Sequence, residues 1–410
     1  MKKFLVFVLL GGILLAFAGP LFAEGKSEAV QPIRLGGVWP LSDITGDQGS
    51  KAAQLAVKEI NAAGGVLGRP LQLIVVDDQM KPESGAAALE RLATIDNVDV
   101  FVGGVLSGVA LAQAPILKKY HKVTVYTGAA AGVFEKTIGP DADWFFHLHP
   151  WDYEQGASYV EGWKAISAKY PNLKLGKWFL AYEEGPFGTA SYQASKVLYA
   201  AIGGSMSGES FKSAALGGGN YSAVLQHAKQ ADPDAFIWAG YDADALPIMQ
   251  QAKAIGFAPP LFIGAPPGWP ADFGKSPLSN DVVLYGMWAP SMSNVSPVSK
   301  HFYDAYVKEY GSEPATYFAP LCYAAIYIIK DAIQRAGSLD EKALIAALEQ
   351  TKYESPLGET ITFKPSNIIK HQGIQGQKIL QWQNGAQQVI WPFAYKTADL
   401  VYPFPGWGGR

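Results

Sequence analysis

Short apolar runs alternate with segments of helical period along the first third of the chain. The apolar runs predict four strands, at Ile33–Val38, Leu71–Val76, Val98–Val102 and Val123–Tyr126. Between them, apolar residues recur at every third or fourth position and predict helices at 48–63, 83–95 and 109–120. Strands that alternate with helices of this length are typical of a parallel, doubly wound α/β sheet. Ligands of such sheets bind beyond the carboxyl ends of the strands.

The same rhythm restarts after Trp151. The pattern predicts helices at Tyr153–Lys169, Thr189–Ala201, Tyr221–Gln230 and Ala243–Ile255. It predicts strands at Lys177–Ala181, Ala235–Trp238, Leu261–Ile263 and Val282–Tyr285. The chain therefore carries two sets of βα units of similar size.

The last part of the chain changes character. Three helices are predicted in succession, near 297–310, 320–335 and 339–349, and residues 360–393 are rich in β-formers. Asn384-Gly385 between two apolar runs predicts a tight hairpin turn. The chain is too long for a single core, so we expect two domains.

The turn after the first strand offers a place for a polar or anionic ligand. It is rich in Ser, Gly and Asp, and it opens a helix with apolar residues at Ala52, Leu55, Ala56 and Ile60. A helix that begins this way presents free backbone N–H groups and a partial positive charge.

The N-terminus reads as a secretion signal. Lys2 and Lys3 precede an apolar stretch, Phe4–Phe17, that is too short to span a bilayer comfortably. Cleavage after Ala18 or after Ala23 is compatible with the small residues that follow, and we prefer the second, which makes 1–23 the signal peptide. We therefore expect a periplasmic or otherwise extracytoplasmic protein.

Composition excludes several functions. The formal net charge is −3 and no basic block occurs, so no nucleic-acid partner is expected. Cys322 is the single cysteine, which rules out an intrachain disulfide.

His147 and His149 share a strand face, but no carboxylate or thiolate set completes a metal site. Gly268–Ser276 has five residues between its glycines, unlike a phosphate-binding loop. We expect no cofactor, no metal and no enzymatic activity.

Several short motifs, in order, resemble one known family. They are Pro40-Leu41-Ser42, Gly46-Asp47-Gln48, Glu59–Gly65, Leu73–Asp78, Gly103–Gly108 and Gly240-Tyr241. Together they make the chain similar to the type I periplasmic solute-binding proteins, and above all to the leucine/isoleucine/valine receptors of ABC importers.

The resemblance implies two doubly wound lobes joined by a three-strand hinge that closes on a solute. Lobe one would comprise 30–152 plus 286–360, and lobe two 153–285 plus 361–410. The closed form would dock on a membrane permease, and we expect the protein itself to be a monomer.

The resemblance also implies solute contacts in the first lobe. Ser107, with the N–H of Gly108, would hold a carboxylate; the alternative is that Ser107 is a plain helix cap. The backbone of Gly128 would contact the solute, or form only a tight turn. Ala130 stands where the family has a Thr, so one hydroxyl contact is missing.

Further contacts are expected where the lobes meet. Asp152 would hold an ammonium or hydroxyl group, or cap the helix that follows, and Trp151 beside it could stack on the solute. Tyr241 matches a cleft Tyr of the family. Phe187, in the loop after Lys177–Ala181, is a candidate apolar wall or a plain loop residue.

The loop Gly264–Trp269 departs from the family, which carries there a Glu that pairs with the solute's ammonium. Either another carboxylate (Asp152, Glu184 or Asp242) replaces it, or the solute has no ammonium. We favour the second, because a buried unpaired ammonium costs several kcal/mol. A solute ring could pack on Trp269, Trp151 or Trp39, unless these are core residues.

We therefore expect the substrate-binding component of an ABC transporter for a small carboxylate solute: an amino acid or, by preference, an ammonium-free and aromatic acid. The alternative is a receptor of the same fold that senses amides or short acids for a signalling partner.

Overall fold

The structure is a computed structural model that describes residues 31–408. Residues from Pro32 onward form one compact unit. The predicted signal peptide, 1–23, lies outside the described residues. Of the residues described, none belongs to a helix long and apolar enough to cross a lipid bilayer.

The first sheet has six strands in the order β13-β5-β4-β3-β1-β2, and every neighbouring pair is parallel. Its strands are β1 (Ile33–Trp39), β2 (Leu71–Asp77), β3 (Val100–Gly103), β4 (Thr124–Tyr126), β5 (Phe145–His147) and β13 (His371–Gln372). The α/β class predicted from the periodicity is confirmed, and each of the four predicted strands is present.

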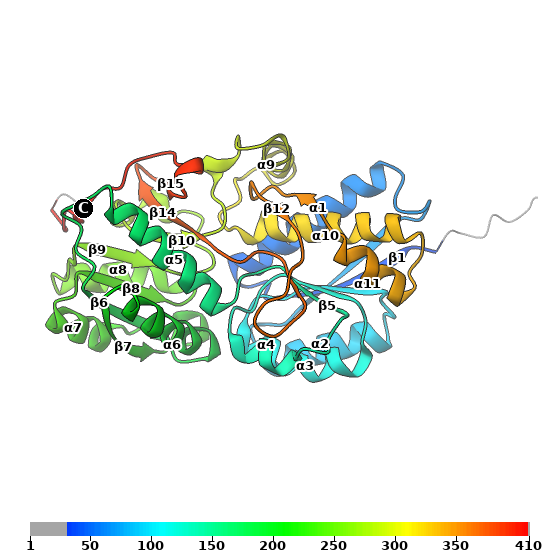
Figure 1. The fold of residues 1–410 in the computed structure, drawn as a ribbon, viewed down its shortest axis with the longest axis horizontal. Helices are drawn as coiled ribbons and strands as arrows, with labels where there is room; N and C mark the ends of the chain where they lie inside the picture. Colours follow the sequence, from blue (N-terminus) through cyan, green and yellow to red (C-terminus); the bar gives the residue numbers. More distant parts are fainter. Residues whose placement is uncertain (1–30, 409–410) are drawn as a thin grey trace, which may run out of the picture. The chain divides into compact units, whose positions relative to one another are not determined.

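Within the described residues, seven helices accompany this sheet in what we call the first lobe (Figure 1). They are α1 (Ile44–Ala62), α2 (Pro82–Thr94), α3 (Ser107–Tyr120), α4 (Gly132–Ile138), α9 (Pro297–Tyr310), α10 (Phe318–Ala336) and α11 (Glu341–Glu349). A small hairpin-like pair, β11 (Tyr353–Glu354) with β12 (Thr360–Ile361), follows α11.

The second sheet has seven strands in the order β15-β14-β10-β9-β8-β6-β7. They are β6 (Lys177–Glu183), β7 (Ser205–Phe211), β8 (Ala235–Ala239), β9 (Leu261–Gly264), β10 (Val283–Gly286), β14 (Lys378–Gln383) and β15 (Ala386–Trp391). Neighbouring strands are parallel among β6, β7, β8, β9 and β10. β14 runs antiparallel to both of its neighbours, β10 and β15. Asn384 and Gly385 both have positive φ, 52° and 80°, as the predicted hairpin turn requires.

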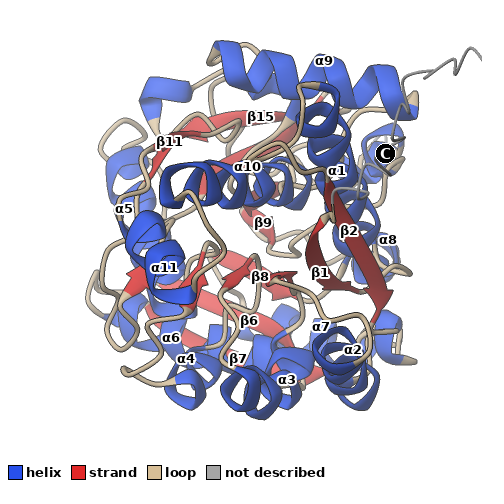
Figure 2. Ribbon diagram, turned by 90° about the vertical axis from the view of Figure 1, so that its right-hand side faces the viewer, coloured by secondary structure: helices blue, strands red, loops and turns tan. Residues whose placement is uncertain are grey.

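Four helices complete this second lobe, and helices lie on both sides of the strands (Figure 2). They are α5 (Asp152–Ser167), α6 (Pro186–Ala200), α7 (Ser222–Ala231) and α8 (Ala245–Ala254).

The chain passes between the lobes after β5, after β10 and after β13. β13 joins the first sheet, with His371 opposite Phe146 and its ring stacked on that ring at 4.1 Å. His371 and Gln372 therefore lie in the first sheet, although they fall within residues 361–410, which were expected in lobe two.

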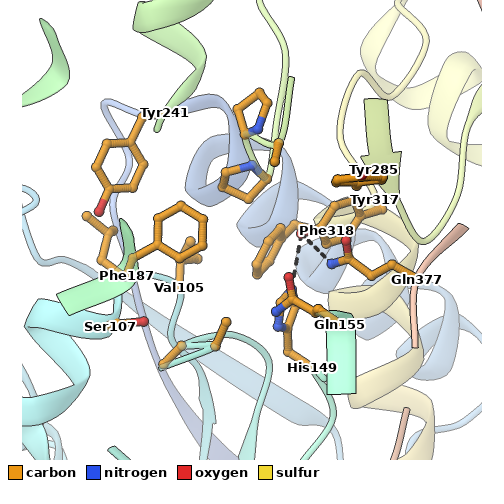
Figure 3. Close-up of a pocket in the computed structure, with 16 residues that line it drawn as sticks. Val105, Ser107, His149, Gln155, Phe187, Tyr241, Tyr285, Tyr317, Phe318 and Gln377 are labelled. Atoms are coloured by element: carbon orange, nitrogen blue, oxygen red, sulfur yellow. Dashed lines mark hydrogen bonds between the residues drawn. The ribbon is translucent and has the colours of Figure 1, made fainter. Parts of the chain in front are cut away.

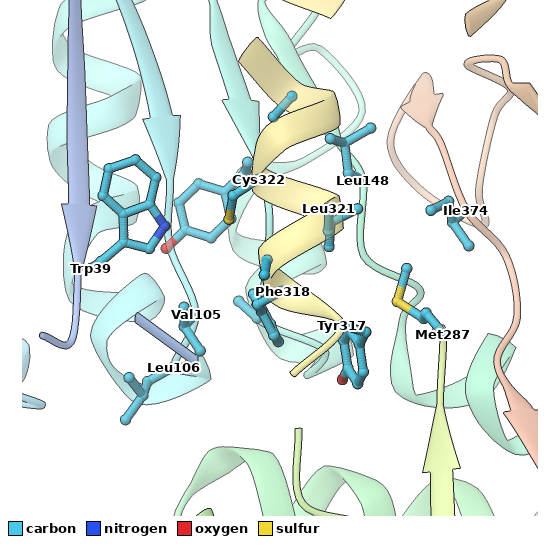
Figure 4. Close-up of a cluster of buried hydrophobic side chains, with 14 of the residues drawn as sticks. Trp39, Val105, Leu106, Leu148, Met287, Tyr317, Phe318, Leu321, Cys322 and Ile374 are labelled. Atoms are coloured by element: carbon cyan, nitrogen blue, oxygen red, sulfur yellow. The ribbon is translucent and has the colours of Figure 1, made fainter. Parts of the chain in front are cut away.

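Buried apolar side chains form two clusters. The larger fills the first lobe around α10, where Phe318, Leu321 and Cys322 face Trp39 and Leu148 (Figure 4). It continues into the second lobe, so the lobes are in contact in this structure. The smaller cluster lies in the second lobe and includes Tyr159, Trp163 and Tyr285.

Candidate functional site

A cavity lies between the lobes, at the carboxyl ends of strands from both sheets. It encloses about 450 Å³ of space, including its opening to solvent. Its first-lobe wall includes Ser107, Ala130, His149, Tyr317 and Phe318. Its second-lobe wall includes Gln155, Phe187, Tyr241, Tyr285 and Gln377 (Figure 3). This is where doubly wound sheets place their ligands.

Ser107 reaches the cavity because β3 ends in two glycines. Gly103 and Gly104 have φ of 101° and 89°, and a Cβ on Gly104 would lie 2.1 Å from the ring of Tyr126. The backbone then turns directly into α3, whose first residue is Ser107. Ser107 is 2% exposed, and its Oγ accepts a hydrogen bond from the N–H of Ala131 at 3.2 Å. Its hydroxyl proton therefore remains free to donate.

The loop after β4 brings a backbone donor to the same place. Ala130 lines the cavity, and within residues 31–408 no protein group accepts a hydrogen bond from its N–H. Gly128 does not line the cavity. A Cβ on Gly128 would lie 2.6 Å from the carbonyl oxygen of Gly104, and its own carbonyl contacts Nε2 of His147 at 2.5 Å. Gly128 thus lets the loops after β3 and β4 approach each other.

A hydrogen-bonded network of neutral groups forms the opposite wall. Nδ1 of His149 lies 3.0 Å from the carbonyl of Pro150, which can only accept, so Nε2 accepts from the Tyr317 hydroxyl at 3.1 Å. Nε2 of Gln377 donates to the Tyr317 oxygen at 3.4 Å. Burial lowers the pKa of His149 to about 3, so this wall carries no charge near neutral pH.

Gln155 and Tyr285 continue this wall in the second lobe. Nε2 of Gln155 donates to the Pro150 carbonyl at 2.8 Å. The hydroxyl of Tyr159 lies 3.2 Å from Oε1 of Gln155 and closer to Oε1 of Gln377, and these two oxygens share its one proton. The ring of Tyr285 stacks on Tyr159 at 3.6 Å, and its hydroxyl accepts from Trp163 Nε1 at 2.8 Å and also pairs with the Tyr199 hydroxyl at 3.0 Å. Tyr285 therefore offers the cavity its ring and not its hydroxyl.

Phe187 and Tyr241 stand near Ser107. Their ring centroids are 6.0 Å apart. The backbone N–H of Tyr241 donates to Asp244 at 2.7 Å, which fixes the turn after β8. Burial, with Glu183 and Asp43 nearby, raises the pKa of Tyr241, so its hydroxyl keeps its proton. Among the described residues, no side chain or carbonyl bonds to that hydroxyl.

Asp152 does not line the cavity. Its carboxylate accepts from the N–H of Gly132 at 3.1 Å and from its neighbour Tyr153 at 2.7 Å. It thereby joins the N-termini of α4 and α5. Gly108, one residue into α3, also lies outside the cavity lining.

The three tryptophans considered as stacking partners lie in the core. Trp39 and Trp151 are fully buried, and Trp151 stacks on His147 at 3.8 Å. Trp269 is 3% exposed and packs edge-on against Trp238 at 5.4 Å. The ring walls of the cavity come instead from Phe187, Tyr285, Tyr317 and Phe318.

No Asp, Glu, Lys or Arg side chain of the described chain lines this cavity. Ala265, Pro266 and Pro267 occupy the loop after β9, and neither Glu184 nor Asp242 reaches the lining. Within residues 31–408, no group of three His, Cys, Asp or Glu side chains could hold a metal ion.

Residues 32–387 match the periplasmic binding protein family. A relative, Leu/Ile/Val-binding protein homolog 7 of Brucella abortus, is 23% identical over 408 residues, covering 95% of this chain and 99% of its own length.

Two solved structures share the fold. The branched-chain amino acid binding protein LivJ of Streptococcus pneumoniae, in complex with isoleucine, aligns with a TM-score of 0.74 and 23% identity, covering 91% of this chain and 100% of its own. A solute-binding protein of an ABC transporter from R. palustris, in complex with benzoate, aligns with a TM-score of 0.74 and 17% identity, covering 92% and 98%. The chain thus belongs to the periplasmic binding proteins, whose members bind solutes and do not catalyse reactions.

Proposed function

We propose that this chain is the extracytoplasmic solute-binding component of an ABC importer, and that its solute is a small, ammonium-free acid with an aromatic body. The observation that carries the proposal is the interlobe cavity. It presents hydrogen-bond donors at one end, aromatic rings along its walls, and no charged side chain of the described residues.

The donors suit a carboxylate. The Ser107 hydroxyl has a free proton, the Ala130 N–H is unpaired within the described chain, and the first N–H groups of α3 have no partner inside the helix. Hydrogen bonds to a charged group contribute about 1.5–3 kcal/mol each. The Ser107 hydroxyl, the Ala130 N–H and the N-terminus of α3 can therefore hold a carboxylate without a lysine or arginine.

The lining does not suit an ammonium. The loop after β9 offers Ala265, Pro266 and Pro267, and the neutral His149 has already committed its acceptor nitrogen to Tyr317. An ammonium buried here without a carboxylate would lose about 3 kcal/mol, roughly a hundredfold in affinity. Both isoleucine and benzoate are bound by proteins of this fold, so the lining residues decide between them.

The ring walls suit an aromatic body. Phe187 faces the cavity from the second lobe and Phe318 from the first, with Tyr285 beyond (Figure 3). Burial of about 150 Å² of a solute ring between them would contribute about 4 kcal/mol. Since the walls come from both lobes, the solute stabilises the closed arrangement over an open one.

Delivery to a permease follows from the relatives. They are named as binding proteins, and the R. palustris protein as part of an ABC transporter, so we prefer transport to sensing. We propose that the closed protein, as a monomer, docks on the membrane permease.

A thermal-shift screen of the purified chain tests the solute class. The panel contains amino acids, aromatic acids, short fatty and keto acids, and amides. A solute well above its Kd raises stability by RT ln(1 + [L]/Kd). We expect the largest shifts from aromatic acids such as benzoate and phenylacetate. If leucine or valine gives the only strong shift, the proposed solute class is wrong.

A further inference from the structure

A second cavity adjoins the solute cavity inside the second lobe. It comprises about 330 Å³ of space, including its opening to solvent, and Gln155, Phe187, Ala265 and Tyr285 line both cavities. We call it the rear chamber. It lies between the second sheet and helices α5 and α6, since its remaining wall includes Leu180 of β6 and Ala239 of β8.

The rear chamber is lined by a serine hydroxyl without a protein partner. Ser195, on α6, lines the chamber and is 8% exposed. Ser191, one turn earlier on the same helix, donates to the carbonyl of Phe187 at 2.9 Å, as helical serines commonly do. The Ser195 hydroxyl makes no hydrogen bond to a protein group within residues 31–408. Its Oγ is not among the fully buried side-chain atoms of the described chain that lack a partner, so it remains accessible and free to pair with a bound molecule.

The boundary between the two cavities carries a spare donor. Gln155 uses one N–H of its amide for the Pro150 carbonyl, and that carbonyl can only accept, so the orientation of the amide is fixed. Its second N–H has no partner among the described residues, and Gln155 lines both cavities. A solute that passes this side chain therefore meets a neutral donor midway.

We infer that the rear chamber is a subsite for the far end of an elongated acid, whose apolar body passes Gln155 and Phe187 and whose terminal hydroxyl or carbonyl group pairs with Ser195. The inference rests on the proposed function, and it names the length and polarity of the solute. The far end is neutral, since no charged side chain of the described residues lines the chamber. Leu180, Ile237 and Ala239 give it an apolar wall on the side of the sheet.

Calorimetric titration of the full chain with four acids tests this subsite. The probes are benzoate, 4-hydroxybenzoate, 3-phenylpropanoate and 3-(4-hydroxyphenyl)propanoate. We expect the hydroxylated long acid to bind about tenfold or more tighter than its phenyl counterpart, since a site built for a hydroxyl discriminates strongly against its loss. We expect no such gain for 4-hydroxybenzoate over benzoate, because the shorter acid does not reach Ser195.

Two substitutions of Ser195 separate the contribution of its hydroxyl from the contribution of the space in the rear chamber. Ser195→Ala should remove the preference for the hydroxyl and leave 3-phenylpropanoate unaffected. Ser195→Leu should fill the chamber and weaken both long acids about a hundredfold, while benzoate binds as before, which also shows that the variant folds. Gln193→Leu, an exposed position on the same helix, is the matched control and should change none of the four affinities.

The outcomes distinguish this inference from the proposed function. If benzoate binds but the long acids bind no more tightly, or bind Ser195→Leu as well as the unmodified chain, the rear chamber is a packing defect and the solute site stands. If none of the four acids binds, the proposed function and the inference both fail.

Discussion

The backbone N–H of Ala131 donates to Oγ of Ser107 across 3.2 Å, and this contact sets the direction of the serine hydroxyl. The serine oxygen accepts this hydrogen bond from the loop after β4, so the hydroxyl proton is not used there. Because Ser107 lines the interlobe cavity, the proton can be donated into it. A residue at the start of a helix thus presents a hydroxyl donor to the cavity, without capping its own helix through its side chain.

Replacing Ser107 should weaken binding while the chain stays folded. Ser107→Ala removes one hydrogen bond to the carboxylate, and we expect about a 10- to 100-fold rise in the Kd for an aromatic acid. Ser222→Ala is the matched control, because Ser222 is also the first residue of a helix but is exposed. Calorimetry measures both. Undiminished affinity in Ser107→Ala would remove this residue from the site.

Tyr241 should contribute through both its ring and its hydroxyl. Tyr241→Ala opens the wall beside Phe187, and we expect affinity to fall about tenfold or more while the chain stays folded. Tyr241→Phe keeps the ring and loses only the hydroxyl, so its loss should be smaller. Titration and circular dichroism of the two variants decide the matter. Equal affinity in Tyr241→Ala and in the unmodified chain would contradict this role.

A carboxylate placed in the loop after β9 should reverse the solute preference. Ala265→Glu introduces a negative charge beside a carboxylate solute, and we expect the affinity for phenylacetate to fall about a hundredfold or more while affinity for an amino acid rises. Ala265→Gln has the same shape without the charge and serves as the control. If the Glu and Gln variants behave alike, charge does not govern the selection.

Asp152 should act on stability and not on affinity. Its carboxylate caps two helix starts, so Asp152→Ala should lower the free energy of unfolding by about 1–2 kcal/mol. Asp340→Ala, which removes the N-cap of α11 at an exposed position, gives a reference for a single cap. Urea unfolding and titration of the same samples separate the two effects. A large loss of affinity in Asp152→Ala, with stability unchanged, would restore it as a ligand.

The buried carboxyl of Asp78 should make a contribution to stability that falls as pH rises from 4 to 7. Burial raises the pKa of Asp78 to about 7, so the folded chain keeps a proton that the unfolded chain releases above its ordinary value near 4. The contribution of this carboxyl therefore decreases across this interval and levels off above pH 7. Burial and the neighbouring Asp242 also raise the pKa of Asp43, in the same direction.

Asp78→Asn tests the pH effect. In the unmodified chain the N–H of Met80 donates to Oδ1 of Asp78 at 2.8 Å, and the amide oxygen of the variant can accept the same hydrogen bond. The amide group does not titrate. We expect a flatter dependence of the urea midpoint between pH 5 and 8 and a more stable chain at pH 8. Asp304→Asn, on the surface, should leave the dependence unchanged. An unaltered slope in Asp78→Asn would show that this carboxyl does not titrate as proposed.

Much of the fold follows from periodicity, because buried parallel strands are continuous apolar runs. Strands β7 and β5 were not predicted, because their sequences lack such an apolar run. Ser205–Phe211 forms β7 at the edge of the second sheet, where alternating polar residues replace the apolar run. Phe145–His147 forms β5 from only three residues, too few for any period.

The candidate site could be predicted where it follows strand ends in sequence. Ser107, Ala130 and Tyr241 each come shortly after a predicted strand, and all line the cavity. Tyr317 and Gln377 could not be predicted, because only the fold brings them to His149 and to each other. Trp39 and Trp269 show the reverse problem, since a sequence does not tell a pocket tryptophan from a core one.

The central claim is that the interlobe cavity selects an acid without an ammonium group. Phenylacetate and phenylglycine differ only by that group, so calorimetric titration of the unmodified chain with this pair tests it most directly. We predict that phenylacetate binds about a hundredfold or more tighter than phenylglycine. Tighter binding of phenylglycine would contradict the claim.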